Sequence, residues 1–160
     1  MSTIPIVTNG VTTIDGPTFG VPVANQLNQK HEHVAYVPGA NIDATNLGVQ
    51  TLWLTLGNLT VPAWAASAII SVCINGVLLA TASGACPYDL QARIGTDVGR
   101  TIRHDSTSAI TTREVSWNDK ITLTSTGAKS LTIYAARISG ADLLRVGVIS
   151  DVTVNATYLG

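Results

Sequence analysis

The chain has 160 residues, of which 46% are hydrophobic and 12% are charged, and its net charge is −1. This length fits one domain, and the near-neutral charge excludes a strongly basic surface for nucleic acid or anionic membranes. The charged fraction is about half the usual value near 25%. Scarce charge predicts that part of the surface is covered by further copies of the chain or by another protein.

Residues 1–33 are predicted to form an N-terminal arm. Asn9-Gly10 lies between two short β-prone runs, which is a strong signal for a hairpin with a two-residue turn. Proline and glycine then interrupt the chain, and residues 24–33 are polar, so the segment has too few large apolar side chains to form its own core. The arm also lacks the basic start and the apolar run of a secretory signal peptide.

From Val34 onward, short runs of β-prone residues recur between segments rich in Gly, Ser, Thr, Asn and Asp. They predict strands at Val34–Val37, Gln50–Leu56, Ala68–Ile74, Val77–Thr81, Leu90–Ile94, Arg100–Arg103, Ile110–Val115, Lys120–Ser125, Leu131–Ile138 and Val146–Tyr158. Many short strands at this spacing predict an all-β fold, a jelly-roll-like antiparallel β-sandwich at residues 34–160 behind the extended N-terminal arm.

Alternation along these strands predicts which side chains face the core. Leu52, Leu54 and Leu56 share one face of their strand, and Trp53 points to the other face. The other residues predicted to face the core are Ile70, Val72, Ile74, Val152 and Val154.

Two further local patterns predict how strands are connected. Asn75-Gly76 has the composition of a type I′ turn and predicts a hairpin between the strands on either side of it. The stretch Val146–Tyr158 alternates apolar and polar residues with only Ser150 out of pattern, and it predicts one long strand.

No motif in the sequence predicts catalysis, so no enzyme and no cofactor are expected. The Gly-x-Ser-x-Gly turn of serine hydrolases is absent, and the ten acidic residues are scattered. His31-Glu32-His33 would place two imidazoles on one face of a strand, but two ligands at this spacing are common by chance, and no metal site is predicted. Cys73 and Cys86 could form one disulfide, although two free thiols are favoured without a secretory signal.

Two groups of residues are candidate contact sites. Arg93, Arg100, Arg103 and Arg113 could contact an acidic partner, because guanidinium groups bind carboxylates through two hydrogen bonds. Acidic residues between them favour local ion pairs equally well. Trp64 and Trp117 are predicted in loops, where their rings could stack on a glycan; rings that plug the end of a sandwich are the alternative.

Three features together carry a resemblance: the Thr/Asn/Gly-rich opening Thr8–Gly16, the polar arm to His33 and the strand series from Val34 to Leu159. In these the chain resembles tailed-phage virion proteins, and it is most similar to capsid decoration (cement) proteins built as a jelly roll. The resemblance implies a non-enzymatic subunit that stabilises a capsid on the virion surface. Its implied partners are the major capsid protein or another virion protein, and itself as a dimer or trimer. A glycan-binding receptor module of a fibre tip or cell surface is the alternative.

Overall fold

The computed structural model describes residues 6–8, 11–13, 29–44, 46–80, 87–105, 110–138 and 143–160. All of its regular elements are β-strands, and the paired strands within its sheets are antiparallel, as the sequence predicts. Within these ranges no helix has the length and apolar character needed to span a membrane.

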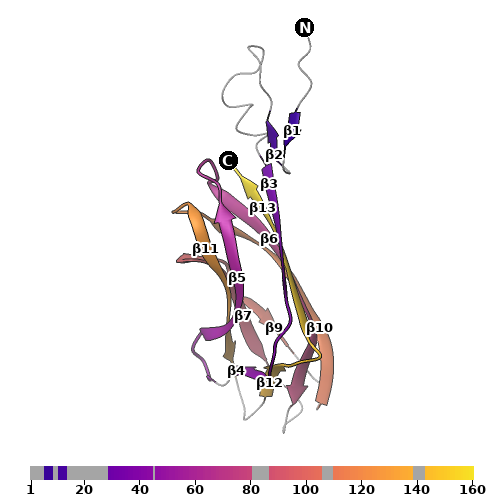
Figure 1. Cartoon of the computed structure of the whole chain (residues 1–160). Coiled ribbons are helices and arrows are strands. Elements are labelled where there is room, and N and C mark those ends of the chain that lie inside the picture. The colour runs from indigo at the N-terminus through magenta and orange to yellow at the C-terminus, as the bar shows by residue number, and fades with distance from the viewer. Residues whose placement is uncertain are drawn as a thin grey trace.

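The strands are β1 (Ile6–Thr8), β2 (Val11–Thr13), β3 (Gln29–Tyr36), β4 (Ile42–Ala44), β5 (Thr51–Val61), β6 (Ser67–Ala80), β7 (Tyr88–Ile94), β8 (Asp97–Val98), β9 (Ile102–His104), β10 (Ile110–Thr122), β11 (Gly127–Arg137), β12 (Leu143–Val146) and β13 (Asp151–Leu159). They form two main sheets that face each other (Figure 1).

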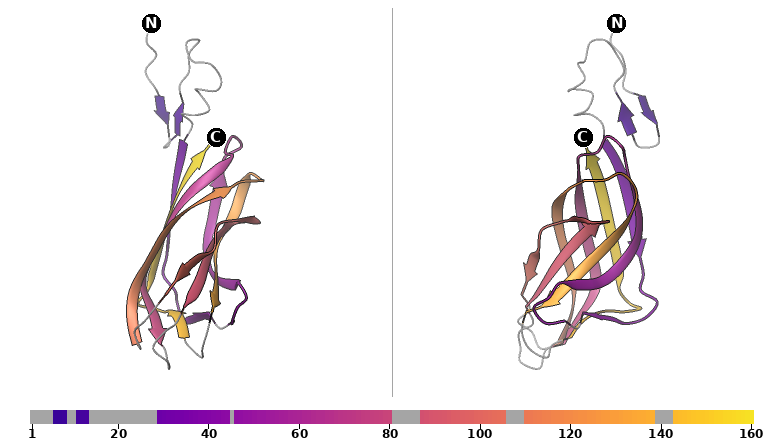
Figure 2. Two further views of the ribbon diagram at one scale, coloured as in Figure 1. Left: turned by 180° about the vertical axis from the view of Figure 1, so that it is seen from behind. Right: turned by 90° about the vertical axis from the view of Figure 1, so that its left-hand side faces the viewer.

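The six-stranded sheet has the order β3-β13-β6-β12-β4. β13 and β12 pair with successive parts of one edge of β6, residues 67–75 and 78–80, and β10 pairs along the other edge. The five-stranded sheet has the order β5-β11-β7-β8, with β9 also paired to β7. The chain passes repeatedly from one sheet to the other, and β13 lies between β3 and β6. This arrangement of antiparallel strands in two facing sheets is that of a jelly roll (Figure 2).

The N-terminal region is described only in part. β1 and β2 pair as an antiparallel hairpin, as Asn9-Gly10 predicts. Residues 1–5, 9–10 and 14–28 of the predicted arm lie outside the described residues. β3 begins at Gln29, so residues 29–33, predicted as arm, are part of the edge strand of the six-stranded sheet.

The predicted core is buried with one exception. The buried members are Leu54, Leu56, Ile70, Val72, Ile74, Val152 and Val154. Leu52 is 54% exposed, and Trp53 is buried instead, with its indole nitrogen donating to the carbonyl oxygen of Ile42. The reason is a β-bulge: Leu52 pairs with Tyr134 and Leu54 with Ile133, so Trp53 is an extra residue that reverses the alternation.

The predicted hairpin at Asn75-Gly76 is wrong. β6 runs straight through these residues, and together they oppose Glu114 of β10 as a further bulge. Gly76 has a φ of 74°, which only glycine adopts without strain. Asn-Gly supplies the same left-handed backbone to a bulge as to a type I′ turn, so the sequence pattern does not distinguish the two.

Replacing Gly76 with alanine is expected to lower the free energy of unfolding by about 2–3 kcal/mol, because a left-handed alanine costs about 1–2 kcal/mol and the new methyl group is crowded. A Cβ at this position would lie 3.1 Å from the Ile149 carbonyl oxygen and 3.2 Å from Ser150 Oγ. Gly48 is the matched control, since its φ is 71° and no atom lies within 4 Å of its added Cβ. Urea unfolding should give a smaller loss for Gly48→Ala; equal losses would contradict the crowding.

Two further strand boundaries differ from the prediction. Residues 116–119 were expected to form a loop, but they continue β10, which pairs with β6 over almost its whole length. The predicted strand Val146–Tyr158 is interrupted by a turn at residues 147–150, where buried Ser150 accepts a hydrogen bond from the Gly147 amide and donates one to the Gly76 carbonyl. Long-range pairing therefore overrides the local composition in both places.

Carboxylates connect the two sheets where their edges meet. At one edge, Glu32 of β3 accepts hydrogen bonds from the Thr60 amide of β5, from Lys30 Nζ at 2.7 Å and from the Tyr158 hydroxyl at 2.6 Å. Burial alone would raise the pKa of Glu32, but these hydrogen bonds outweigh it and lower the pKa below its ordinary value.

The opposite edge is connected in the same way. Asp119 of β10 is buried and accepts hydrogen bonds from the backbone amide and Nε of Arg100. Asp97 of β8 is also buried and accepts from the backbone amide and hydroxyl of Thr124. These carboxylates satisfy backbone groups that the sheets leave unpaired at their edges.

Candidate interaction surface

The side chains that point away from the core on β3, β13, β6 and β10 form one surface, here called the outer face. Strand register sets three cross-strand rows on it: His31–Thr157–Ile69–Lys120, His33–Asn155–Ser71–Asn118 and Ala35–Thr153–Cys73–Ser116. The two rows that contain Ser71 and Cys73 carry no carboxylate, ammonium or guanidinium group. The middle of the outer face is therefore polar but uncharged.

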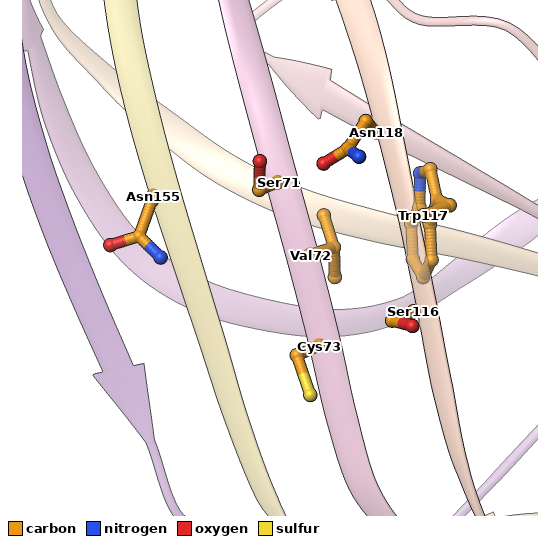
Figure 3. A pocket seen from close by; sticks show the side chains of 7 residues that line it. All are labelled: Ser71, Val72, Cys73, Ser116, Trp117, Asn118 and Asn155. Atoms are coloured by element: carbon orange, nitrogen blue, oxygen red, sulfur yellow. The ribbon is translucent and has the colours of Figure 1, made fainter.

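A shallow depression of about 240 Å³ lies on the outer face over β13, β6 and β10 (Figure 3). It is lined by Ser71, Val72, Cys73, Ser116, Trp117, Asn118 and Asn155. The side chains of Val72 and Trp117 are buried in the core, so the groups offered to a ligand are hydroxyls, amides and one thiol. This lining suits a neutral side chain better than an ion.

Cys73 is a free thiol at this depression. Burial, Glu114 and Asp151 all raise its pKa, so the thiol stays protonated at neutral pH and is a weak nucleophile. Cys86 lies outside the described residues.

His31 and His33 both point outward from β3, as their spacing predicts. Nδ1 of His31 lies 2.9 Å from Thr157 Oγ1, and Nδ1 of His33 lies 2.9 Å from Asn155 Oδ1. Glu32 between them points the other way and connects the sheets. Among the described residues, no group of three or more His, Cys, Asp or Glu side chains is placed to hold a metal ion.

His104 lies in the core region rather than on the outer face. Its ring stacks on Tyr88 at 5.5 Å between centroids and meets Trp117 edge-on at 6.2 Å. Burial lowers the pKa of His104, and Asp105 and Asp89 offset this only in part. The imidazole is therefore held in its neutral form at neutral pH.

Two of the predicted contact arginines lie on the five-stranded sheet and are held by neighbouring side chains. The Arg93 guanidinium lies 3.5 Å from the centroid of the Tyr134 ring. Arg103 donates to both carboxylate oxygens of Asp89, at 2.8 and 3.1 Å. Arg103 thus forms a local ion pair, as in the alternative, whereas the local partner of Arg93 is an aromatic ring.

The other two predicted arginines lie elsewhere. Arg100 follows β8, and its Nε is 3.0 Å from the buried carboxylate of Asp119, although the Arg100 side chain is 72% exposed. Arg113 is part of β10 in the six-stranded sheet. The four arginines are therefore spread over two sheets and a connection, and their contact with an acidic partner stays a prediction.

The two predicted glycan-contact tryptophans are not equivalent. Trp117 is not in a loop but in β10, and it is 7% exposed with its ring in the core. Trp64 lies in the connection between β5 and β6 and is half-buried against the core. Stacking on a glycan needs an exposed ring face, and the buried Trp117 does not offer one.

One end of the sandwich carries exposed apolar side chains that the sequence analysis did not single out. These residues, here called the apolar end, are Val37, Leu47, Val49, Val148 and Ile149, which are between 55% and 80% exposed. Val37 follows β3, two precede β5, and two precede β13, so all five lie at the end away from the C-terminus (Figure 1). Their signal was present in the sequence, since each lies within two residues of a glycine or proline in a connection between strands.

No protein-family model matches the chain, and no curated protein matches it in sequence. Among solved structures, it is similar to the VP2 subviral particle of infectious bursal disease virus, with 14% identity and a TM-score of 0.46 over 82% of this chain and 32% of that one. The chain thus spans about a third of that capsid protein.

Two other solved structures match the chain with lower TM-scores. One is the baseplate tripod of bacteriophage Tuc2009, with 11% identity and a TM-score of 0.40 over 100% of this chain and 79% of that one. The other is a carbohydrate-binding module of Cellvibrio mixtus lichenase 5A, with 16% identity and a TM-score of 0.29 over 72% of this chain and 95% of that one. Likenesses at these TM-scores assign neither a family nor a function.

Proposed function

We propose that the protein is a non-enzymatic structural subunit of a virion, which decorates and stabilises a capsid through protein–protein contacts. The observation that carries this proposal is the apolar end. At this end, three connections expose five large apolar side chains. Exposed apolar patches of this kind mark sites of contact with another protein. The scarce charge of the chain supports the same role, because a lone soluble domain usually keeps a charged surface.

The positions of the acidic side chains support a structural rather than a catalytic role. Glu32, Asp97 and Asp119 accept hydrogen bonds that connect the sheets. Asp43 forms a two-point ion pair with Arg145, at 2.6 and 2.8 Å. A general acid or base needs a carboxyl group free to exchange a proton with a substrate, and these groups are committed to holding strands together.

Co-sedimentation with capsids of the virus whose genome encodes the chain tests the proposal. The wild-type protein should sediment with the particles, and the double variant Val148→Asp/Ile149→Asp should bind at least roughly 10-fold more weakly, because it puts two charges into a contact that excludes water. Val98→Asp is the control, since Val98 is 51% exposed but lies in β8, which pairs with the end of β7 away from the apolar end. Absence of the wild-type protein from the pellet, or equal binding of all three proteins, would contradict the capsid-binding role.

A further inference from the structure

The outer face has an exposed apolar side chain next to its depression. Ile69 is 40% exposed, and among the described residues it is the exposed large apolar side chain of this face. It lies two residues from Ser71 along β6, a distance of about 7 Å along a strand. An exposed apolar side chain and a depression this close on one sheet face are elements of a self-complementary contact.

We propose that two copies of the chain pack face to face through the outer face, with Ile69 of each copy seated in the depression of the other. This inference goes beyond the proposed function, because it concerns contact between two copies of the chain rather than contact with a capsid.

Strand register shows how a two-fold axis would match the two copies. The axis lies between the outer faces of the two copies and runs across the strands, midway between the row of Ile69 and the row of Ser71. Rotation about it places the Ile69 row of one copy over the Ser71 row of the other. Ile69 then lies opposite Ser71 of the other copy, at the depression, and Thr157 lies opposite Asn155 of the other copy. Both contacts occur twice, since a two-fold contact pairs residue i with j and j with i.

The charge distribution is compatible with this partner. A self-associating face must not bring like charges opposite each other, because such contacts cost free energy. Under this axis Lys120 lies opposite Asn118 of the other copy, and Glu114 and Asp151 lie outside the two exchanged rows, so these side chains do not face like charges. The outer surface of the five-stranded sheet is different, because Asp89, Arg93 and Arg103 lie on it.

The area of the outer face and the types of side chain on it also fit a dimer. Four strands about 4.8 Å apart and nine residues long give a footprint on the order of 550 Å², compared with about 800 Å² per partner in a standard interface. Most of its side chains are Ser, Thr, Asn and Cys, which lose little conformational entropy when they are held at a contact. A modest but specific homodimer follows from these quantities.

Sedimentation equilibrium of the isolated full-length protein tests the inference. The wild type should be a dimer in reversible equilibrium with the monomer. Ile69→Asp should raise the dimer dissociation constant at least roughly 100-fold, because the substitution removes the Ile69 contact in both copies of the dimer. Ser116→Arg fills the depression and leaves residue 69 unchanged, and it should also raise the dissociation constant. Leu52→Asp, on the opposite sheet, should leave the dimer unchanged.

Circular dichroism and thermal unfolding of each variant show that the fold is retained, so that a loss of dimer reports on the contact. A monomeric or trimeric wild type, or a dimer that both Ile69→Asp and Ser116→Arg leave intact, would overturn the inference. The capsid-binding role is tested separately, since a wild-type dimer that fails to sediment with capsids would refute that role and leave this contact standing.

Discussion

Replacing Leu54 with alanine is expected to lower the free energy of unfolding by about 2–5 kcal/mol, whereas the same change at Leu52 should alter it by less than about 0.5 kcal/mol. Leu54 is 1% exposed, and its removal leaves a cavity between the sheets in addition to the lost burial. Leu52 is 54% exposed and loses little on truncation. Urea unfolding of the two single variants measures both values.

The pair is informative because simple alternation puts both leucines on the same face. The bulge at Trp53 separates them, and it turns the Trp53 ring into the core together with Leu54. Similar losses for the two variants would show that β5 is paired in the regular register, with Trp53 pointing outward. A large loss for Leu52→Ala alone would contradict the described sheet.

Replacing Glu32 with glutamine is expected to lower the free energy of unfolding by about 1–3 kcal/mol at pH 7, since hydrogen bonds to a charged group are worth more than neutral ones and solvent screens part of the effect. The glutamine has one acceptor oxygen for donors that approach two in the wild type, from Thr60, Lys30 and Tyr158. Its amide nitrogen would also face a donor. The connection between β3 and β5 should weaken accordingly.

The pH dependence of this loss follows from the direction of the Glu32 pKa shift. The folded-state pKa lies below the ordinary value of 4.5, so the stabilising contribution is fully present above pH 4.5 and is lost as the pH falls through the folded-state pKa. The difference in unfolding free energy between wild type and Glu32→Gln should therefore narrow below pH 4.5. Denaturant titrations at a series of pH values from 7 to 3 measure this difference.

His104 contributes a separate step at higher pH. Its folded-state pKa is lowered, so the unfolded chain takes up a proton first and stability begins to fall below the ordinary pKa of 6.5. That step should be present in both wild type and Glu32→Gln. It therefore cancels in the difference between the two proteins, and a difference that stays constant from pH 7 to 3 would refute the assignment to Glu32.

The fold class could be predicted from the sequence because the alternation that defines strands is a local property. Along β13 and most of β6, successive residues alternate between core and surface in the structure as they do in the sequence, so Val152, Val154, Ile70 and Val72 are buried as predicted. A series of such strands without an amphipathic helical stretch leaves few folds other than a sandwich.

Local patterns failed where one signal serves two structures. Asn75-Gly76 suits a hairpin turn and a bulge equally well, and pairing with β10 decided for the bulge. Residues 116–119 resemble a loop in composition but continue a strand, because β6 supplies a partner along their whole length.

The candidate interaction surface shows the same division. The sequence by itself determined that the chain is an all-β protein with little charge, because composition and alternation belong to the residues themselves. The tertiary structure alone decided that Trp117 is buried, that Ile69 lies beside a depression and that apolar residues from three connections lie at one end. These are relations between strands distant in the sequence, and they depend on the register of each pairing, which a single bulge can reverse.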